Sequence, residues 1–378
     1  MIYLDNSATT RPYPEVLALY TKLSNEYFGN PSSLHTLGME AEKILNQARK
    51  KMAAFLECSS NQLVFTSGGT EANALALYGT VKRHSYAHII TTTVEHASVY
   101  ENLQALEQSG YDVTYLQADQ FGRVTVDQVK EAIQPSTVLV SIGHVQGELG
   151  TIQPIEEIGK ALQSYPQIKF HVDAVQSLLK VPFSIIEAGI DLMTLSAHKV
   201  HGTKGTGLLF SKNPKTLESM TKGGSQEQML RPGTENTAGI ACFAKAISKS
   251  AQKAVYEQKR LKQLTRHLRS ELEQIKGVRI NTPKEGTAPH ILNLSIPGVK
   301  AEVLVQALGY EKIYVSTQSA CSTKTGKPSR ILLGCGLNED RARSSIRISL
   351  SFETKKEEID LCIETLHSII PKLQEVMK

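Results

Sequence analysis

The apolar positions of the first 210 residues alternate between two kinds of pattern. Stripes at helical spacing, the clearest of which covers 36–55 with Leu45 and Met52 on its apolar face, predict amphipathic helices. Short continuous apolar runs between the stripes predict buried strands. Helices are expected over 15–25, 36–55, 71–82, 98–108, 126–134 and 154–163, and strands over 64–66, 88–92, 111–116, 137–143, 170–173, 192–195 and 208–210. This alternation is typical of parallel βαβ units, so we predict an α/β fold with a mainly parallel sheet.

The pattern changes in a long helical stripe over 237–276. Its first half, with Phe243 and Ile247, is apolar, its second half is charged and amphipathic, and Gly277 is a natural end for the helix. Further strands are expected over 289–296 and 313–316, and helices over 301–308, 338–343 and 356–375. A chain of 378 residues is long enough for about two domains. We expect a large domain formed by residues 14–250 and a small α+β domain formed by residues 1–13 and 251–378.

The composition excludes several classes of protein. The 42 Lys and Arg residues nearly balance the 37 Asp and Glu residues, no dense basic block occurs and Trp is absent, so direct nucleic-acid binding is not expected. No apolar run reaches about 18 residues, which argues against a membrane span, and the first ten residues do not resemble a signal peptide. The five cysteines show neither a zinc pattern nor a disulfide framework, so we expect no resident metal and a cytoplasmic location.

The first candidate for chemistry is Lys199, which follows the apolar run at 192–195. A lysine directly after a buried strand loses hydration, which lowers its pKa and makes the neutral amine available for a Schiff base with an aldehyde cofactor. Ser196 and His198 suit the edge of a phosphate site, and the segment up to Gly207 is rich in glycine. An ordinary surface lysine in a turn is the alternative for an isolated Ser-x-His-Lys motif.

Two further strand ends carry groups that suit the same cofactor. Asp173 ends one apolar run and Gln176 follows it; such a carboxylate is the known partner of the protonated ring nitrogen of pyridoxal phosphate. Gly69 and Thr70 lie between the strand expected at 64–66 and a helix start, where backbone N–H groups bind phosphate. Together with the lysine, these elements predict a pyridoxal phosphate site.

With these motifs, the chain resembles the cysteine desulfurases, which are pyridoxal-phosphate enzymes of the class V aminotransferase group with the type I fold. The resemblance runs from the Tyr-Leu-Asp-Asn-Ser-Ala-Thr-Thr segment at 3–10 to the Ser-Ile-Arg segment at 345–347, and is strongest for the housekeeping branch. It implies a large domain with a mainly parallel sheet flanked by helices and a smaller α+β domain. It also implies conversion of L-cysteine to L-alanine, with transfer of the sulfur to acceptor proteins, either an iron–sulfur scaffold or a tRNA thiolation enzyme.

The resemblance assigns roles to individual residues. Lys199 would hold the cofactor and move the α-proton of the substrate, while Asp173 would keep the ring nitrogen protonated. His96 would stack on the ring and move protons; without the resemblance it is an ordinary helix-cap histidine. Arg347 would bind the substrate carboxylate, although a surface arginine on an edge strand shows the same pattern. Thr234 would close the phosphate site of a second subunit, which implies a homodimer; an Ω-loop is the alternative.

Cys321 lies in the segment 319–328, which is rich in small and turn-forming residues. Lys324 and Lys327 favour ionisation of its thiol. The match to the cysteine loop of the family implies that Cys321 is the nucleophile that forms the persulfide, and makes it a candidate for transient iron–sulfur binding. Three other thiols lie in helical apolar patterns and are expected to be inert: Cys58, Cys242 and Cys362. The role of Cys335 is left open.

One position departs from the family. Gly147 stands where the family carries the second Asn of an Asn-Asn-Glu motif, whose side chain contacts the phenolic oxygen of the cofactor. We expect Gln176 or an ordered water to compensate. Three other functions stay open: a selenocysteine lyase, a class V aminotransferase that needs no loop cysteine, and a sulfur-relay protein without turnover, which Gly147 would favour.

Overall fold

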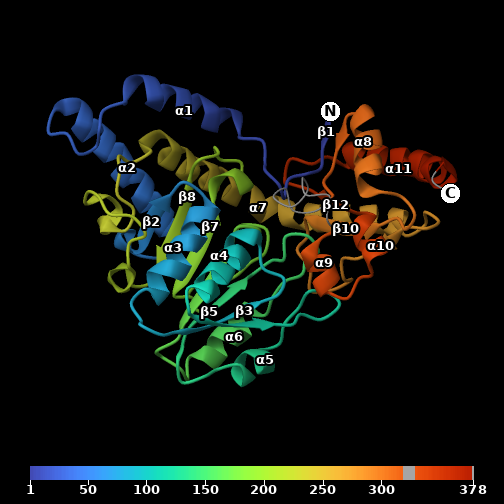
Figure 1. Cartoon of the computed structure of the whole chain (residues 1–378). Coiled ribbons are helices and arrows are strands. Elements are labelled where there is room, and N and C mark those ends of the chain that lie inside the picture. Colours follow the sequence, from blue (N-terminus) through green and yellow to red (C-terminus); the bar gives the residue numbers. More distant parts are fainter. Residues whose placement is uncertain (318–327, 377–378) are drawn as a thin grey trace.

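The computed structural model describes residues 1–317 and 328–376, and the largest sheet within them has seven strands (Figure 1). The strands are β2 (Leu63–Thr66), β3 (His88–Thr92), β4 (Asp112–Leu116), β5 (Thr137–Gly143), β6 (Lys169–Asp173), β7 (Leu192–Ser196) and β8 (Gly207–Ser211). Their order is β2-β8-β7-β6-β5-β3-β4, and β8 runs antiparallel to both of its neighbours while the other pairs are parallel. The predicted α/β fold with a mainly parallel sheet is therefore confirmed.

Helices cover both faces of this sheet, which explains why most of its strands are buried along their whole length. The helices of this part of the chain are α1 (Pro14–Glu26), which packs on α7, and α2 (Thr36–Phe55), α3 (Gly69–Val81), α4 (Ala97–Gln108), α5 (Val126–Glu131), α6 (Ile155–Leu162) and α7 (Thr237–Leu272). On one face, Met52 of α2, Ile158 of α6 and Phe243 of α7 belong to one apolar core. On the other face, Leu75 of α3 and Leu103 of α4 belong to a second core. The carboxyl ends of the strands stay open to a ligand.

A third core lies among the C-terminal elements and the first strand. Its sheet has the order β12-β10-β9 and is antiparallel, and a separate parallel pair joins β1 to β11. The elements are β1 (Ile2–Tyr3), β9 (Arg279–Ile280), β10 (Ile291–Ser295), α8 (Ala301–Tyr310), β11 (Ile313–Tyr314), α9 (Arg330–Gly334), α10 (Glu339–Arg343), β12 (Ser345–Ser349) and α11 (Lys356–Val376). Figure 1 shows β1 beside α8 and α11, so both ends of the chain lie at this side of the molecule.

Helix α7 connects the two parts of the molecule. Phe243 packs in the core of the large sheet, whereas Leu261 and Leu268 pack in the C-terminal core. The helix ends at Leu272, earlier than the predicted end at 276. The reason is that the following turn tightens: the N–H of Ile275 donates to the carbonyl of Leu272, an i to i+3 bond of 3.2 Å.

The division into a large domain of residues 14–250 and a small domain of residues 1–13 and 251–378 stays a prediction. Among the described residues, no helix combines the length and the apolar character that a membrane crossing requires.

Candidate active site

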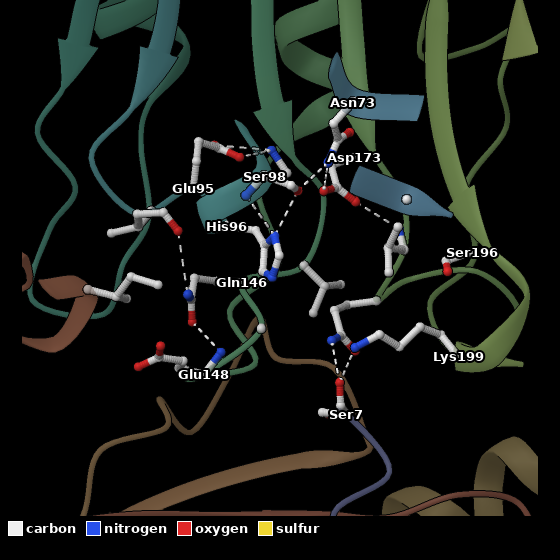
Figure 2. A pocket seen from close by; sticks show the side chains of 18 of the residues that line it. Ser7, Asn73, Glu95, His96, Ser98, Gln146, Glu148, Asp173, Ser196 and Lys199 are labelled. Atoms are coloured by element: carbon white, nitrogen blue, oxygen red, sulfur yellow. Dashed lines mark hydrogen bonds between the residues drawn. The ribbon is translucent and has the colours of Figure 1, made fainter. Parts of the chain in front are cut away.

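The carboxyl ends of β5, β6 and β7 border a cavity of about 310 Å³ (Figure 2). This is the edge of an α/β sheet where ligands bind. The N-terminal segment, α3, the start of α4, the turn after β5, α9 and β12 supply the other walls. Ten of the predicted site residues line it: Gly69, Thr70, His96, Gly147, Asp173, Gln176, Ser196, His198, Lys199 and Arg347.

Lys199 enters the cavity from a single 3₁₀ turn that directly follows β7. Its amine donates to the backbone carbonyl of Ser7 and, at 3.1 Å, to that of Ala8, so the N-terminal segment holds it in place. Beneath it, the amine of the buried Lys180 donates to the carbonyl of Lys199 at 3.2 Å, and burial together with the Lys199 charge lowers the pKa of Lys180 to about 7. Burial likewise lowers the pKa of His198 to about 4, so this imidazole is neutral.

Asp173 ends β6 with both carboxylate oxygens in use. The N–H of Val175 donates to Oδ1 at 3.0 Å, and Nδ2 of Asn73 donates to Oδ2 at 2.8 Å. These two donors come from the following turn and from α3, so the orientation of the carboxylate is fixed from two directions (Figure 2). The group therefore presents a preorganised acceptor for a cationic ring N–H.

The start of α3 has the features of an anion site. First-turn N–H groups of a helix have no partner within it, and they attract phosphate. A side chain at Gly69 would come within 3.1 Å of Val175 Cγ2, so the glycine keeps this end open. Gly207 is needed for a similar reason, because a Cβ there would lie 2.4 Å from the Gly68 carbonyl carbon and would push the start of α3 out of place. Ser196 Oγ lies beside this end, buried and without a hydrogen-bond partner.

Arg347 also lines the cavity and is 1% exposed, which excludes the surface arginine that its edge strand allowed. Its guanidinium donates to Asp5 Oδ1 at 3.0 Å and to the Gly147 carbonyl at 2.9 Å. Its Nε is buried and has no hydrogen-bond partner. Burial raises the pKa of the Asp5 carboxyl despite the adjacent Arg347 charge. The site therefore holds a fixed cation that keeps donor capacity.

The departure at Gly147 is matched by Gln176. A Cβ at Gly147 would lie 3.6 Å from Gln176 Nε2, so the glutamine lies beside the space that a larger side chain would take. Gln176 Nε2 donates to the carbonyl of Ser7 at 3.0 Å, while its Oε1 is buried without a partner. Gln146 fixes the turn itself, because its Oε1 accepts from the N–H groups of Glu148 and Leu149 at 2.7 and 2.6 Å.

Glu95 also lines the cavity and is not among the sequence predictions, although it directly precedes His96. Its carboxyl accepts from Thr92 Oγ1 at 2.7 Å and from the Gly143 N–H at 3.0 Å. Burial nevertheless raises its pKa from 4.5 to about 7. Asn73, Ser98 and Asp5 were equally missed, although Asp5 lies in the 3–10 segment that carries the resemblance and Asn73 lies in the helix expected over 71–82.

We expect Glu95→Gln to change how stability depends on pH. A native pKa above the unfolded value means that the folded state binds this proton more tightly, so wild-type stability falls as pH rises from about 4.5 through about 7. The glutamine lacks this titration. The melting temperature of the variant minus that of the wild type should therefore increase as the pH rises across that window. Glu107→Gln, at an exposed position of α4, is the control. A difference that stays constant with pH would contradict the expectation.

The remaining predicted residues lie elsewhere. Thr234 is exposed and does not line the cavity; its Oγ1 accepts a hydrogen bond of 3.5 Å from Asn30. Cys321 lies outside the described residues. Cys58 is partly buried in a turn beyond α2, which ends at Phe55, so its predicted place in a helix is wrong. Within residues 1–317 and 328–376, no group of three side chains could hold a metal ion.

Comparisons with known proteins agree with this site. The family model for class V aminotransferases matches residues 2–362. The chain is 39% identical over 378 residues to "Cysteine desulfurase IscS" from Dictyoglomus turgidum, covering 99% of this chain and 96% of that protein. A solved "NIFS-LIKE PROTEIN" has a TM-score of 0.92 and 33% identity, covering 98% of this chain and all of the other. Another solved structure, "SspA in complex with cysteine", has a TM-score of 0.80 and 32% identity, covering 93% and 99%. The chain thus has the type I fold of pyridoxal-phosphate enzymes and belongs to the class V aminotransferase family, within its NifS- and IscS-like group.

Proposed function

We propose that this protein is a pyridoxal-phosphate-dependent cysteine desulfurase. The observation that carries the proposal is that one cavity joins the amine of Lys199, the carboxylate of Asp173 and the guanidinium of Arg347. A carboxylate, an amine and an anion site suit the cofactor, and an arginine suits an amino-acid substrate. The names of the relatives in the NifS- and IscS-like group support the choice of L-cysteine.

The residues present fit the cofactor. Ser196 Oγ, buried without a partner, is available to its phosphate, and the second N–H of Gln176 Nε2, besides the one given to the Ser7 carbonyl, is available to its phenolic oxygen. The open start of α3 would hold the phosphate, Asp173 the ring nitrogen and Lys199 the aldehyde carbon. When bound, pyridoxal phosphate supplies an electron sink for the bonds at the substrate Cα.

The protein then supplies binding, proton transfer and a sulfur acceptor. Arg347 binds the substrate carboxylate through its remaining donor capacity. Lys199 moves the proton at the substrate Cα. Cys321 takes the sulfur: the substrate Cβ–S bond breaks and an S–S bond forms, so that a thiol and L-cysteine become a persulfide and L-alanine. No external oxidant is needed, because the substrate carbon is reduced as the two sulfurs are oxidised.

The proposal is tested by incubating the purified holoenzyme with L-cysteine and measuring L-alanine and sulfide. Equal amounts of both are expected in the presence of a reductant that releases the persulfide. L-selenocysteine assayed in parallel identifies a selenocysteine lyase if only that substrate turns over. Amino transfer to a keto acid would identify an aminotransferase. Protein that stays colourless with added cofactor would favour the sulfur-relay function.

Arg347→Gln is expected to lower kcat/KM for L-cysteine about 10²-fold, because a buried charge-assisted contact to the carboxylate is lost. The effect should fall mainly on KM. Arg279→Gln, at an exposed position of β9, is the matched control and should leave KM unchanged. Since the change also leaves Asp5 without its cation, the melting temperature and Arg347→Lys are measured in parallel. An unchanged KM in a folded variant would contradict the assignment.

Thr234 contributes to the phosphate site of a second subunit in this proposal, and the protein is a homodimer. The exposure of Thr234 outside its own cavity supports this arrangement. Light scattering after size-exclusion chromatography tests it, and a monomeric active enzyme would contradict it.

The acceptor of the sulfur is an iron–sulfur scaffold or a tRNA thiolation enzyme in this proposal, and the enzyme works in the cytoplasm. Capture of persulfide-trapped partners identifies the acceptor.

A further inference from the structure

A chain of hydrogen bonds connects Asp173 to His96 along one wall of the cavity (Figure 2). Nδ2 of Asn73 donates to Asp173 Oδ2 and to Ser98 Oγ, both at 2.8 Å. Ser98 Oγ lies 2.8 Å from Nδ1 of His96. Asn73 and Ser98 are buried, at 1% and 8% exposure, so little water competes for these groups.

The direction of each bond in this chain is fixed. A carboxylate only accepts hydrogen bonds, so the amide group of Asn73 that faces Asp173 is its NH₂. That group has two N–H bonds, one for each acceptor, and Ser98 Oγ therefore accepts from Asn73. The hydroxyl proton of Ser98 is then available to Nδ1 of His96.

A second donor points at the same ring nitrogen. His96 is the N-cap of α4, and the backbone N–H of Ser98 donates to its Nδ1 at 3.1 Å. A backbone N–H can only donate, so Nδ1 must keep its lone pair. The proton of the neutral ring therefore lies on Nε2.

The charges around the ring also oppose an imidazolium. Burial is the main cause that lowers the pKa of His96, and the cations Lys199, Arg347 and Arg330 act in the same direction. Asp173 opposes them. Glu95, the preceding residue, adds little negative charge below its own pKa of about 7. Protonation would also place a hydrogen on Nδ1 against the backbone N–H of Ser98 and would break the cap of α4.

We infer that Asn73 and Ser98 are positioning residues that keep His96 neutral with its proton on Nε2, so that His96 acts as a hydrogen-bond donor in the cavity. What this protonation state means for catalysis rests on the proposed function. In a cysteine desulfurase, a ring in this state has no free lone pair, because Nδ1 faces the two donors of Ser98 and Nε2 carries the proton. The neutral His96 can therefore donate to the substrate through Nε2 but does not take a proton from it.

Nitrogen-15 NMR of the holoenzyme labelled at histidine tests the inference directly. A His96→Asn sample identifies the two signals of the ring by their loss. Between about pH 6 and about pH 9 we expect Nδ1 to show the shift of an unprotonated nitrogen and Nε2 that of a protonated one. A proton on Nδ1, or titration of both nitrogens near the ordinary pKa of about 6.5, would overturn the inference. Neither outcome depends on turnover, so failure here is distinct from failure to desulfurate cysteine.

Substitutions at Ser98 test the role of its hydroxyl. Ser98→Ala removes one of two donors to Nδ1 but keeps the backbone N–H, so we expect the pKa of His96 to rise by about one unit. Ser98→Thr keeps a hydroxyl and should restore the wild-type value. Ser109→Ala, at the other end of the same helix, is the matched control and should change nothing. An unchanged His96 in Ser98→Ala would show that the hydroxyl does not hold the ring.

Discussion

Lys199→Ala is expected to lower the formation of L-alanine from L-cysteine at least about 10³-fold. The substitution removes both the covalent attachment of the cofactor and the group that moves the substrate α-proton. Lys204→Ala, at an exposed position of the same loop, should retain wild-type activity. Because both variants remove one positive charge from this loop, a loss seen only in Lys199→Ala is caused by the missing amine in the cavity.

A chemical test accompanies this variant. Borohydride reduction of the wild-type holoenzyme, followed by peptide mapping, should place a pyridoxyl group on Lys199. The buried Lys180 lies next to it, and burial holds its pKa at about 7, so it is the competing amine. An adduct on Lys180 would show that Lys180, and not Lys199, is the amine that binds the cofactor. An adduct on neither lysine would refute the proposed use of the cofactor.

Cys321→Ala is expected to reduce sulfide release from L-cysteine at least about 10³-fold while leaving the cofactor absorbance intact. The described thiols support this choice, because burial raises their pKa values. The value rises to about 11 for Cys58 and to about 12 for the others: Cys242, Cys335 and Cys362. None of these four is therefore a thiolate at neutral pH, and only a thiolate attacks sulfur efficiently.

Cys58→Ala is the matched control, because Cys58 is the described thiol that is only partly buried. It should keep full activity, and alkylation followed by mass spectrometry should find the persulfide on Cys321 in both the control and the wild type. Sulfide release that survives in Cys321→Ala would show that the sulfur leaves by another route.

The cofactor-binding half of the site was predictable because its signals are local. Asp173 and Lys199 each follow an apolar run, and the glycine turn at Gly69 precedes a helix, so the pattern of each motif is complete within a few residues. The rule that ligands bind at the carboxyl ends of parallel strands then brings them together. The structure adds that all three line one cavity.

The other half was not predictable from local pattern. The ion pair between Asp5 and Arg347 joins residues 342 positions apart, and nothing in either neighbourhood specifies the other partner. The same holds for the chain from Asp173 through Asn73 to Ser98, because its three members come from different elements. Arg347 also illustrates why exposure is hard to infer: its strand is at the edge of its sheet, yet the N-terminal segment covers the side chain.

The N-terminal segment that holds both Lys199 and Arg347 has a consequence for biosynthesis. Asn6 donates a hydrogen bond to the carbonyl of Ser349, so the segment docks on a strand that is translated 343 residues later. Ribosomes add about 5–20 residues per second, which separates the two by tens of seconds. During that interval the nascent chain can complete its large sheet, but the segment that aligns both cationic side chains lacks the β12 surface that it binds in the folded protein. The arrangement of both side chains is therefore complete only after β12 has been translated.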